Sequence, residues 1–308
     1  MTLTVAYLPD RLAFSTYDVF TTLRFSGNPL AIVHGADGLS PASMQTIARE
    51  FNLSETIFVQ TPDDPSHSAK VRIFFPTAEI PFAGHPTIGC AIDLATKAHP
   101  SGDFDVTITL EEQAGLVPVR VQRAGNHLSA EFQAPVVPFP AHDGVVPDIE
   151  TLADAVGLAP SQIGFGLHAP GVFEGGPRFM YVPVADLDAL AQSQPQEPAW
   201  SKAIALGAVD NAYLYTKTPD GFQARMFSPT AGIPEDPATG SASAILAAQL
   251  LASGALSDGD TSLTLVQGVE MGRPSQIGFR AMATEGALQS VHISGSAILI
   301  SDGHIALP

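Results

Sequence analysis

The chain has 308 residues, of which 45% are hydrophobic and 15% charged, and its formal net charge is −17 at pH 7. This composition is typical of a globular protein with a substantial core, and the length suits one large domain or two of ordinary size. The acidic balance argues against nucleic acid or an anionic membrane as partner, because phosphate groups are bound by clustered Lys and Arg.

The sequence also limits the kinds of site the chain can carry. Its one cysteine, Cys90, excludes an intramolecular disulfide and a cysteine-rich metal centre. The histidines show neither HxH nor HExxH spacing, and no P-loop or GxGxxG turn after a strand is present. We therefore expect neither a metal nor a cofactor.

Two further features predict a soluble, cytoplasmic protein. The N-terminal residues lack a basic region followed by an apolar one, so no signal peptide is expected. The longest apolar stretch, residues 244–256, is too short and too rich in Ala, Gln and Ser to span a bilayer.

The first part of the chain predicts strands and helices followed by an antiparallel meander. Ser40 begins a helix that has one apolar face. The expected strands are residues 13–20, 30–35 and 56–60, the expected helices are 41–51 and 86–97, and the meander covers 102–133.

Residues 134–148 are rich in Pro and Gly and predict a linker. We therefore divide the chain into a first half, 1–133, and a second half, 134–308, whose last strand could cross back to the first. The second half predicts helices at 148–157, 199–205 and 239–252, and strands at 179–184, 210–217, 261–267, 275–283 and 289–300.

One stretch of the sequence occurs twice in closely similar form. Residues 72–81 read RIFFPTAEIP and residues 225–234 read RMFSPTAGIP, which agree at seven of ten positions: Arg, Phe, Pro, Thr, Ala, Ile and Pro. Each copy reads as a short apolar strand and a turn, followed by small residues that open a helix. A unit repeated this far apart predicts two similar halves.

The residues after the two copies align with a one-residue gap, which places Gly84 opposite Asp236. If the halves face each other, two helix N-termini point into one cleft. Unpaired N–H groups and the helix dipole favour an anion there, such as the carboxylate of a small substrate.

Four ordered motifs resemble those of the PhzF family of phenazine biosynthesis-like proteins. They are GNPLAIV (27–33), NLSETIFV (52–59), FFPTAEIPFAGHPTIGCA (74–91) and FSPTAGIPEDPATGSASA (227–244). The resemblance covers essentially the whole chain. It implies the α+β diaminopimelate epimerase-like fold, in which two pseudo-symmetric halves each wrap a barrel-like sheet around a central helix, with the active site between them. It also implies a homodimer.

Glu55 is the first candidate catalytic residue. One interpretation is structural: Glu55 is a glutamate at the start of a strand or in a cap. The other is catalytic: Glu55 is a general base and acid whose pKa is raised by burial in a cleft. In the family that the motifs resemble, the Glu of the NLSET-type motif carries the proton, and we favour that role here.

His85 and Asp236 are the other two candidate catalytic residues. His85 lies at a helix N-terminus, where the dipole disfavours imidazolium, so a neutral hydrogen-bonding ring is expected. Asp236 is a good helix N-terminal acid, and it could also assist proton movement or hold a substrate amine across the cleft from Glu55. The resemblance places both residues at the active site.

Five residues are expected to bind the substrate. Asn28 fixes a turn near the site and could contact the ligand. By resemblance, the two helix N-termini supply the backbone groups that cradle the substrate carboxylate. These further residues are Gly84, Thr239, Gly240 and Ser241.

The chain lacks a pair of catalytic cysteines. Relatives of the diaminopimelate epimerase and proline racemase type use one thiol from each half, at the positions of Gly84 and Asp236 here. Cys90 lies two turns into its helix among apolar residues and is expected to be a buried packing residue. This argues against two-cysteine racemisation.

The function expected is therefore that of a cofactor-free isomerase, in which one carboxylate moves a proton on a small carboxylate-bearing substrate. In the family the reaction is the isomerisation of trans-2,3-dihydro-3-hydroxyanthranilate. An amino-acid epimerase of the same fold is a closely related alternative. A catalytically silent small-molecule binder that uses the same cleft is an alternative of another class.

Overall fold

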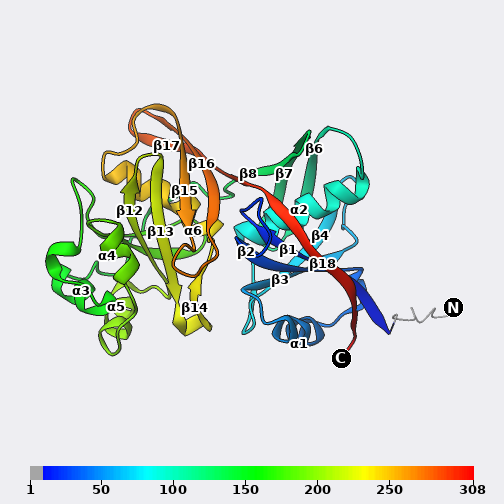
Figure 1. Cartoon of the computed structure of the whole chain (residues 1–308), viewed down its shortest axis with the longest axis horizontal. Helices are drawn as coiled ribbons and strands as arrows, with labels where there is room; N and C mark the ends of the chain where they lie inside the picture. Colours follow the sequence, from blue (N-terminus) through cyan, green and yellow to red (C-terminus); the bar gives the residue numbers. More distant parts are fainter. Residues whose placement is uncertain (1–9) are drawn as a thin grey trace.

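The computed structural model describes residues 10–308, with the side chain of Ala231 left out. The chain forms two halves that lie side by side (Figure 1). In each half, strands surround one buried helix: α2 (Gly84–Ala98) in the first half and α6 (Gly240–Ala252) in the second. This is the α+β architecture predicted from the sequence. The residues on which the expected lack of a signal peptide depends, 1–9, lie outside the described part.

The first half follows the predicted order closely. Its other elements are β1 (Arg11–Val19), β2 (Asn28–His34), α1 (Pro41–Phe51), β3 (Glu55–Gln60), β4 (Ala69–Phe74), β5 (Glu79–Ile80), β6 (Phe104–Glu112), β7 (Gly115–Ala124) and β8 (His127–Gln133). The expected meander is the antiparallel set β6–β7–β8.

The second half contains more elements than the sequence predicted, because β9, β10, α4 and β14 are short. Its elements besides α6 are β9 (Phe139–Pro140), α3 (Ile149–Val156), β10 (Gly171–Glu174), β11 (Arg178–Pro183), α4 (Leu187–Gln192), α5 (Ala199–Gly207), β12 (Ala212–Thr218), β13 (Gly221–Ser228), β14 (Ile233–Asp236), β15 (Gly259–Gln267), β16 (Ser275–Thr284) and β17 (Ala287–Gly295).

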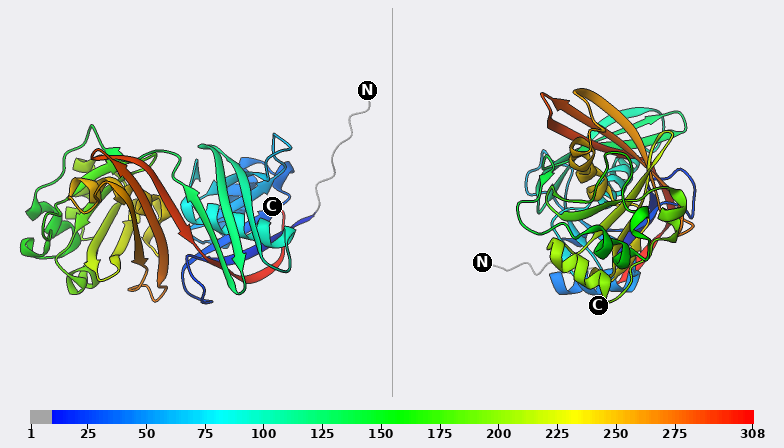
Figure 2. Two further views of the ribbon diagram at one scale, coloured as in Figure 1. Left: turned by 90° about the horizontal axis from the view of Figure 1, so that it is seen from above. Right: turned by 90° about the vertical axis from the view of Figure 1, so that its left-hand side faces the viewer.

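The last part of the chain runs from the second half back to the first (Figure 2, left). The prediction of one strand over 289–300 was wrong: β17 pairs with β16 and β8, and a separate β18 (Ala297–Ala306) pairs with β1. The break falls at Ser296, whose carbonyl accepts hydrogen bonds from the backbone N–H of Phe20 and Thr21. The division at residue 134 stays a prediction, and we propose that β18 belongs to the first half.

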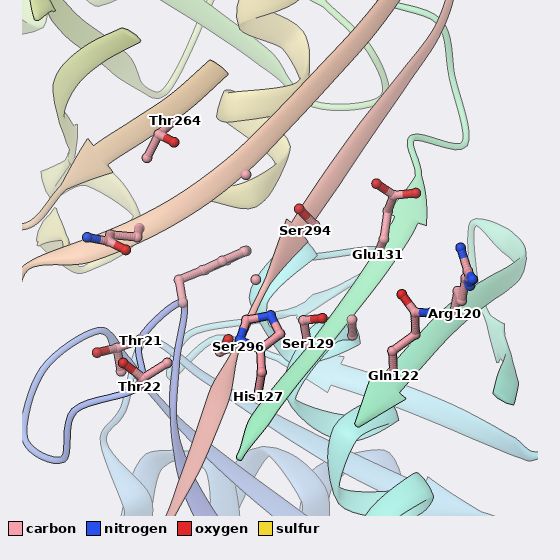
Figure 3. Close-up of a pocket in the computed structure, with 15 residues that line it drawn as sticks. Thr21, Thr22, Arg120, Gln122, His127, Ser129, Glu131, Thr264, Ser294 and Ser296 are labelled. Carbon is pink, nitrogen blue, oxygen red and sulfur yellow. The ribbon is translucent and has the colours of Figure 1, made fainter. Parts of the chain in front are cut away.

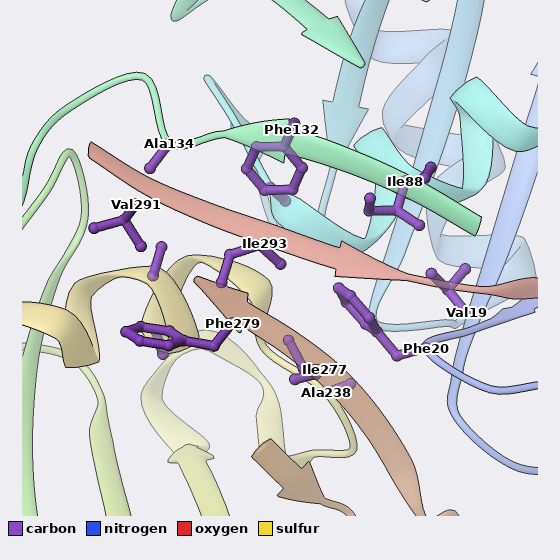
Figure 4. Packing of buried hydrophobic residues seen from close by; sticks show 14 of the residues in the cluster. Val19, Phe20, Ile88, Phe132, Ala134, Ala238, Ile277, Phe279, Val291 and Ile293 are labelled. Carbon is purple, nitrogen blue, oxygen red and sulfur yellow. The ribbon is translucent and has the colours of Figure 1, made fainter. Parts of the chain in front are cut away.

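One hydrophobic cluster joins the two halves. Ile88 and Phe132 from the first half belong to the same buried cluster as Phe279 and Ile293 from the second (Figure 4). Phe20 packs directly over Gly295, where a Cβ atom would lie 2.3 Å from its ring. The two halves therefore share one continuous core.

The first residues of α2 and α6 are in backbone contact. A Cβ atom on Gly84 would lie 2.8 Å from the Cα of Gly240. The helix starts therefore match Gly84 with Gly240, whereas the one-residue gap aligned Gly84 with Asp236. Pro86, expected at the first helical position, is the third residue of α2. It is tolerated there because the first four N–H groups of a helix have no partner within the helix.

Gly84→Ala is expected to lower the free energy of unfolding by about 1–3 kcal/mol, although alanine favours helix more than glycine does. The new methyl group would meet the backbone of Gly240 and Ser241, which cannot turn aside as a flexible side chain would. Chemical denaturation measures the change. An unchanged midpoint would contradict the close approach of the two helices.

Candidate active site

A cavity of about 570 Å³ lies between the two halves. Both halves line it, the first through residues such as Phe75 and Phe82 and the second through Phe179 and Met226. Four of the eight predicted site residues are among its lining residues: Glu55, Asp236, Thr239 and Ser241. The other four lie next to them, as the hydrogen bonds and contacts described below show. They are Asn28, Gly84, His85 and Gly240.

Glu55 is positioned by the end of α1. Ser40 caps the start of that helix through its side chain, and Asn52 ends it in the left-handed conformation, at φ 51°. The chain then enters β3, whose first residue is Glu55, opposite Leu30 on the parallel strand β2. The Glu55 side chain is therefore held by the sheet rather than by a loop.

The Glu55 carboxyl group is buried and only partly satisfied. The residue is 6% exposed, and its Oε2 atom has no hydrogen-bond partner within the described chain. Burial, and then the negative charge of Asp236, raise the pKa of Glu55 well above its ordinary value. A carboxyl group in this state holds a proton more readily than an exposed one, which suits a group that takes up a proton and later returns it.

His85, the second residue of α2, is a neutral ring. Burial lowers its pKa to about 3, against a hydrogen bond to the Pro29 carbonyl that raises it. Because Nε2 has no hydrogen-bond partner among residues 10–308, Nδ1 is the nitrogen that donates to Pro29. Nε2 is then an acceptor, 3.4 Å from Oε2 of Glu55. A protonated Glu55 can therefore donate to His85.

Asn28 links the two halves at the site. Its Nδ2 atom lies 2.8 Å from Oδ1 of Asp236, 2.9 Å from the Ala238 carbonyl and 3.2 Å from Nδ1 of His85. An amide has two hydrogens, so the two shorter contacts take them. This agrees with Nδ1 of His85 donating to another group.

Asp236 ends β14 and is buried. Burial raises its pKa to about 6, while hydrogen bonds from Thr239, Asn28 and Ser54 lower it. The Thr239 hydroxyl donates to Oδ2 of Asp236 over 2.5 Å. The site thus holds two carboxyl groups, Glu55 and Asp236, in environments that differ, which is a common basis for dividing acid and base roles.

The N-termini of α2 and α6 are free of side-chain caps. Neither Ala83 nor Thr239, the two N-cap residues, makes a capping hydrogen bond through its side chain. Because the first N–H groups of both helices lack such partners and the helices meet at Gly84 and Gly240, their dipoles converge on the cleft. This arrangement favours a bound anion.

Sequence reasoning missed two residues that hold this site. Gln267, at the end of β15, donates to the backbone carbonyl of Asp236 and accepts from the backbone N–H of Thr239. Ser54 donates to the Asp236 carboxylate. Ser54 lies inside the NLSET motif beside Glu55, so that motif could have pointed to it. Nothing in the strand pattern around Gln267 marks it.

Cys90 is buried, as predicted. It is 0% exposed, and burial with the nearby Asp93 and Glu112 raises the pKa of its thiol. A neutral thiol inside α2 has no access to the cavity, and the chain has no second cysteine.

Cys90→Ala is expected to leave turnover almost unchanged and to lower the free energy of unfolding by about 1 kcal/mol, because it leaves a small core cavity. Activity and thermal denaturation of the variant test this. A large loss of turnover in the folded variant would reopen a thiol mechanism.

A second cavity, of about 380 Å³, lies where β7 and β8 meet β15, β16 and β17 (Figure 3). None of the predicted site residues lines it. Its charged side chains already have partners, since Arg120 binds Asp105 and Glu131 binds Arg280. It therefore offers no convergent chemistry of the kind found between the halves.

Among residues 10–308, no three His, Cys, Asp or Glu side chains are grouped to hold a metal ion. No helix in the same part of the chain is long and apolar enough to cross a membrane.

The site places two carboxyl groups in a cavity between two similar halves, and relatives that match nearly the whole chain are isomerases. The sequence matches the family of phenazine biosynthesis-like proteins, PhzC-PhzF, over residues 17–303. The chain belongs to this family, and its fold is the diaminopimelate epimerase-like fold.

Individual relatives agree with this assignment. An uncharacterised isomerase of Mesorhizobium japonicum is 41% identical over 94% of this chain and 97% of its own length. The trans-2,3-dihydro-3-hydroxyanthranilate isomerase of Pseudomonas fluorescens is 35% identical over 94% of this chain and 98% of its own. The crystal structure of a PhzF-family protein from Bacillus anthracis superimposes with a TM-score of 0.83 at 23% identity, covering 96% of this chain and 99% of that one.

Proposed function

We propose that the protein is a cofactor-independent isomerase that moves a proton between two carbons of a small carboxylate-bearing substrate. The observation that carries this proposal is the buried Glu55 carboxyl group, which has an unpartnered oxygen and a raised pKa at the wall of the cavity. Its neighbours His85 and Asp236 leave it free to exchange a proton with a ligand.

In the proposed mechanism, the substrate carboxylate binds at the N-termini of α2 and α6. The backbone there belongs to Gly84, Gly240 and Ser241, with Thr239 as the N-cap of α6. This end of the cavity is where N–H groups and helix dipoles converge. The same N–H groups lie close to the negative charge that develops on the substrate as its proton is removed, and they stabilise that charge.

Glu55, ionised, takes a proton from an acidic carbon and becomes the neutral acid. It then returns that proton to a second carbon of the same substrate, so that the double bond shifts and no net proton is gained or lost. His85, whose Nε2 atom lies 3.4 Å from Oε2 of Glu55, keeps the carboxyl group in place between the two steps. Asp236, held by Asn28, orients the substrate from the other side.

The substrate itself is proposed by likeness to the relatives named trans-2,3-dihydro-3-hydroxyanthranilate isomerase. A cyclic amino acid of this size suits a cavity whose walls are mainly apolar and also include the acidic residues Glu55, Asp210 and Asp236. Epimerisation at one carbon uses the same proton carrier and is the second candidate. Homodimerisation stays an expectation from the family resemblance, and a cytoplasmic location stays a prediction from the sequence.

Deuterium wash-in tests the proposal. The protein is incubated in heavy water with trans-2,3-dihydro-3-hydroxyanthranilate and a panel of cyclic and acyclic amino acids, and products are analysed by mass spectrometry and NMR. Deuterium at a new carbon supports isomerisation, whereas deuterium at the original carbon with inversion supports epimerisation. Saturable binding of a carboxylate without any exchange would favour the silent binder.

A further inference from the structure

The repeated stretch builds the same side-chain clamp in both halves. In each copy the first arginine lies over the ring of the phenylalanine two residues later: Arg72 over Phe74 at 5.5 Å, and Arg225 over Phe227 at 4.8 Å. Stacking of this kind fixes a guanidinium plane. The Arg and Phe identities shared by the two copies therefore have a structural cause.

Each arginine then binds a glutamate on the following short strand. Arg72 donates two hydrogen bonds, of 2.7 and 2.6 Å, to the carboxylate of Glu79 in β5. Arg225 donates two hydrogen bonds, each of 2.8 Å, to the carboxylate of Glu235 in β14. Paired bonds from one guanidinium to one carboxylate give both strength and a fixed geometry. Both clamps hold the strand that leads into a helix N-terminus at the cleft.

The clamp in the second half is the more deeply buried one. The side chain of Arg225 is 6% exposed, against 21% for Arg72. Its Nη1 atom also donates to three backbone carbonyls at the end of α4. These belong to Leu190, Ala191 and Ser193. Arg225 thus ties β13, β14 and α4 together behind the active site.

Strand geometry connects this clamp to Asp236. Met226 pairs with Asp236 across β13 and β14, and Met226 and Asp236 both line the cavity. Because successive side chains of a strand point to opposite faces, Arg225 and Glu235 lie on the face behind them. Glu235 is therefore the nearest negative charge along the chain to Asp236, and Arg225 neutralises it.

We propose that Arg225 is a positioning residue that acts through Glu235 to fix the place and the charge surroundings of Asp236. This inference rests on the proposed function only for its consequence on turnover. The charged and titratable groups around Asp236 are Glu55 on β3, Tyr213 on β12 and, through Asn28, His85 on α2. Glu235 lies on the opposite strand face, next to Arg225 and Glu270.

The proposal predicts effects of opposite sign for the two partners. Glu235→Gln leaves the positive charge of Arg225 with only the more distant Glu270 carboxylate, 3.9 Å away, and should lower the pKa of Asp236. Arg225→Gln leaves Glu235 unbalanced and should raise it. Because the two side chains lie on opposite faces of the strand, we expect the pKa of Asp236 to change by about 0.5 or more in each variant. A purely structural role would not reverse its sign between the two variants.

The experiment is a titration of the Asp236 side-chain carboxyl carbon by NMR in protein labelled with ¹³C-aspartate, the signal being assigned by its loss in Asp236→Asn. Glu79→Gln, in the matching clamp of the first half, is the control and should leave the Asp236 midpoint unchanged. The titration does not depend on turnover. The proposal about Arg225 can therefore be wrong while the proposed function is right, and the proposed function can be wrong while the proposal about Arg225 is right.

Arg225→Gln removes a buried charge with several partners and could prevent folding. Arg225→Lys keeps the charge but cannot make the paired bonds, so it should leave the Asp236 midpoint near that of wild type and lower kcat about tenfold or more through misplacement. An unchanged midpoint in Glu235→Gln, or an equal change in Glu79→Gln, would overturn the proposal. So would full kcat in a folded Arg225→Lys variant that exchanges deuterium.

Discussion

Glu55→Gln is expected to lower deuterium exchange and turnover by about 10³-fold or more, because the amide can neither accept nor return the proton. The fold should be retained. The neutral amide has nearly the shape of the protonated acid that burial favours at this position. Activity and the free energy of unfolding, measured on the same preparation, check the two halves of the expectation.

The sign of the stability change follows from the direction of the pKa. A carboxyl group whose pKa is raised on folding stabilises the folded state fully below its ordinary pKa, and this stabilisation is lost as pH rises through the folded pKa. Because glutamine does not ionise, the Glu55→Gln variant does not lose stability as the pH rises. The variant should therefore be as stable as wild type in acid and more stable at neutral pH.

Glu112→Gln is the matched control for Glu55. Glu112 is also buried, and burial raises its pKa to about 8, but it binds Thr87 inside the first half and does not line the cavity. Its variant should keep turnover. If Glu55→Gln retained turnover as well, Glu55 would not be the proton carrier.

Much of the site was predictable because its signals are local. Ser40 and the spacing of Met44, Ile47 and Ala48 predicted α1, which ends where Glu55 begins β3. The repeated stretch predicted that two helix N-termini would share one cleft, and α2 and α6 meet there. Short-range chemistry of caps, apolar spacing and repetition was enough for these features.

The remaining features depend on partners far away in the chain. Asn28 bonds to Asp236 and Ala238, more than two hundred positions further on, and β18 completes the sheet beside β1 at the opposite end of the sequence. The start of α2 at Gly84 depends on the space left by Gly240. No local pattern encodes such contacts, because they arise only when the two halves close on one another.

Asp236→Asn is expected to be more stable than wild type above pH 6 and equally stable near pH 3. The pKa of Asp236 is raised from 3.8 to about 6, so the folded protein holds this proton more tightly than the unfolded chain and loses stability between these values. The difference corresponds to roughly 3 kcal/mol at 1.36 kcal/mol per pH unit. Denaturation at pH 3, 5 and 8 measures it, and an equal stability change at all three would contradict the buried acid.

The same Asp236→Asn variant should show kcat/KM lowered by about 10²-fold. The pH dependence of its residual activity distinguishes two roles for Asp236. Asp236 raises the pKa of Glu55 through its negative charge. As the base, Glu55 must be ionised, so kcat/KM rises with pH through its pKa, and removing the neighbouring charge moves this acidic limb to lower pH. A limb that stayed in place while activity fell would mean that Asp236 only contacts the substrate. A limb displaced to lower pH would identify the two carboxyl groups as one coupled acid–base pair, with Glu55 the member that moves the proton.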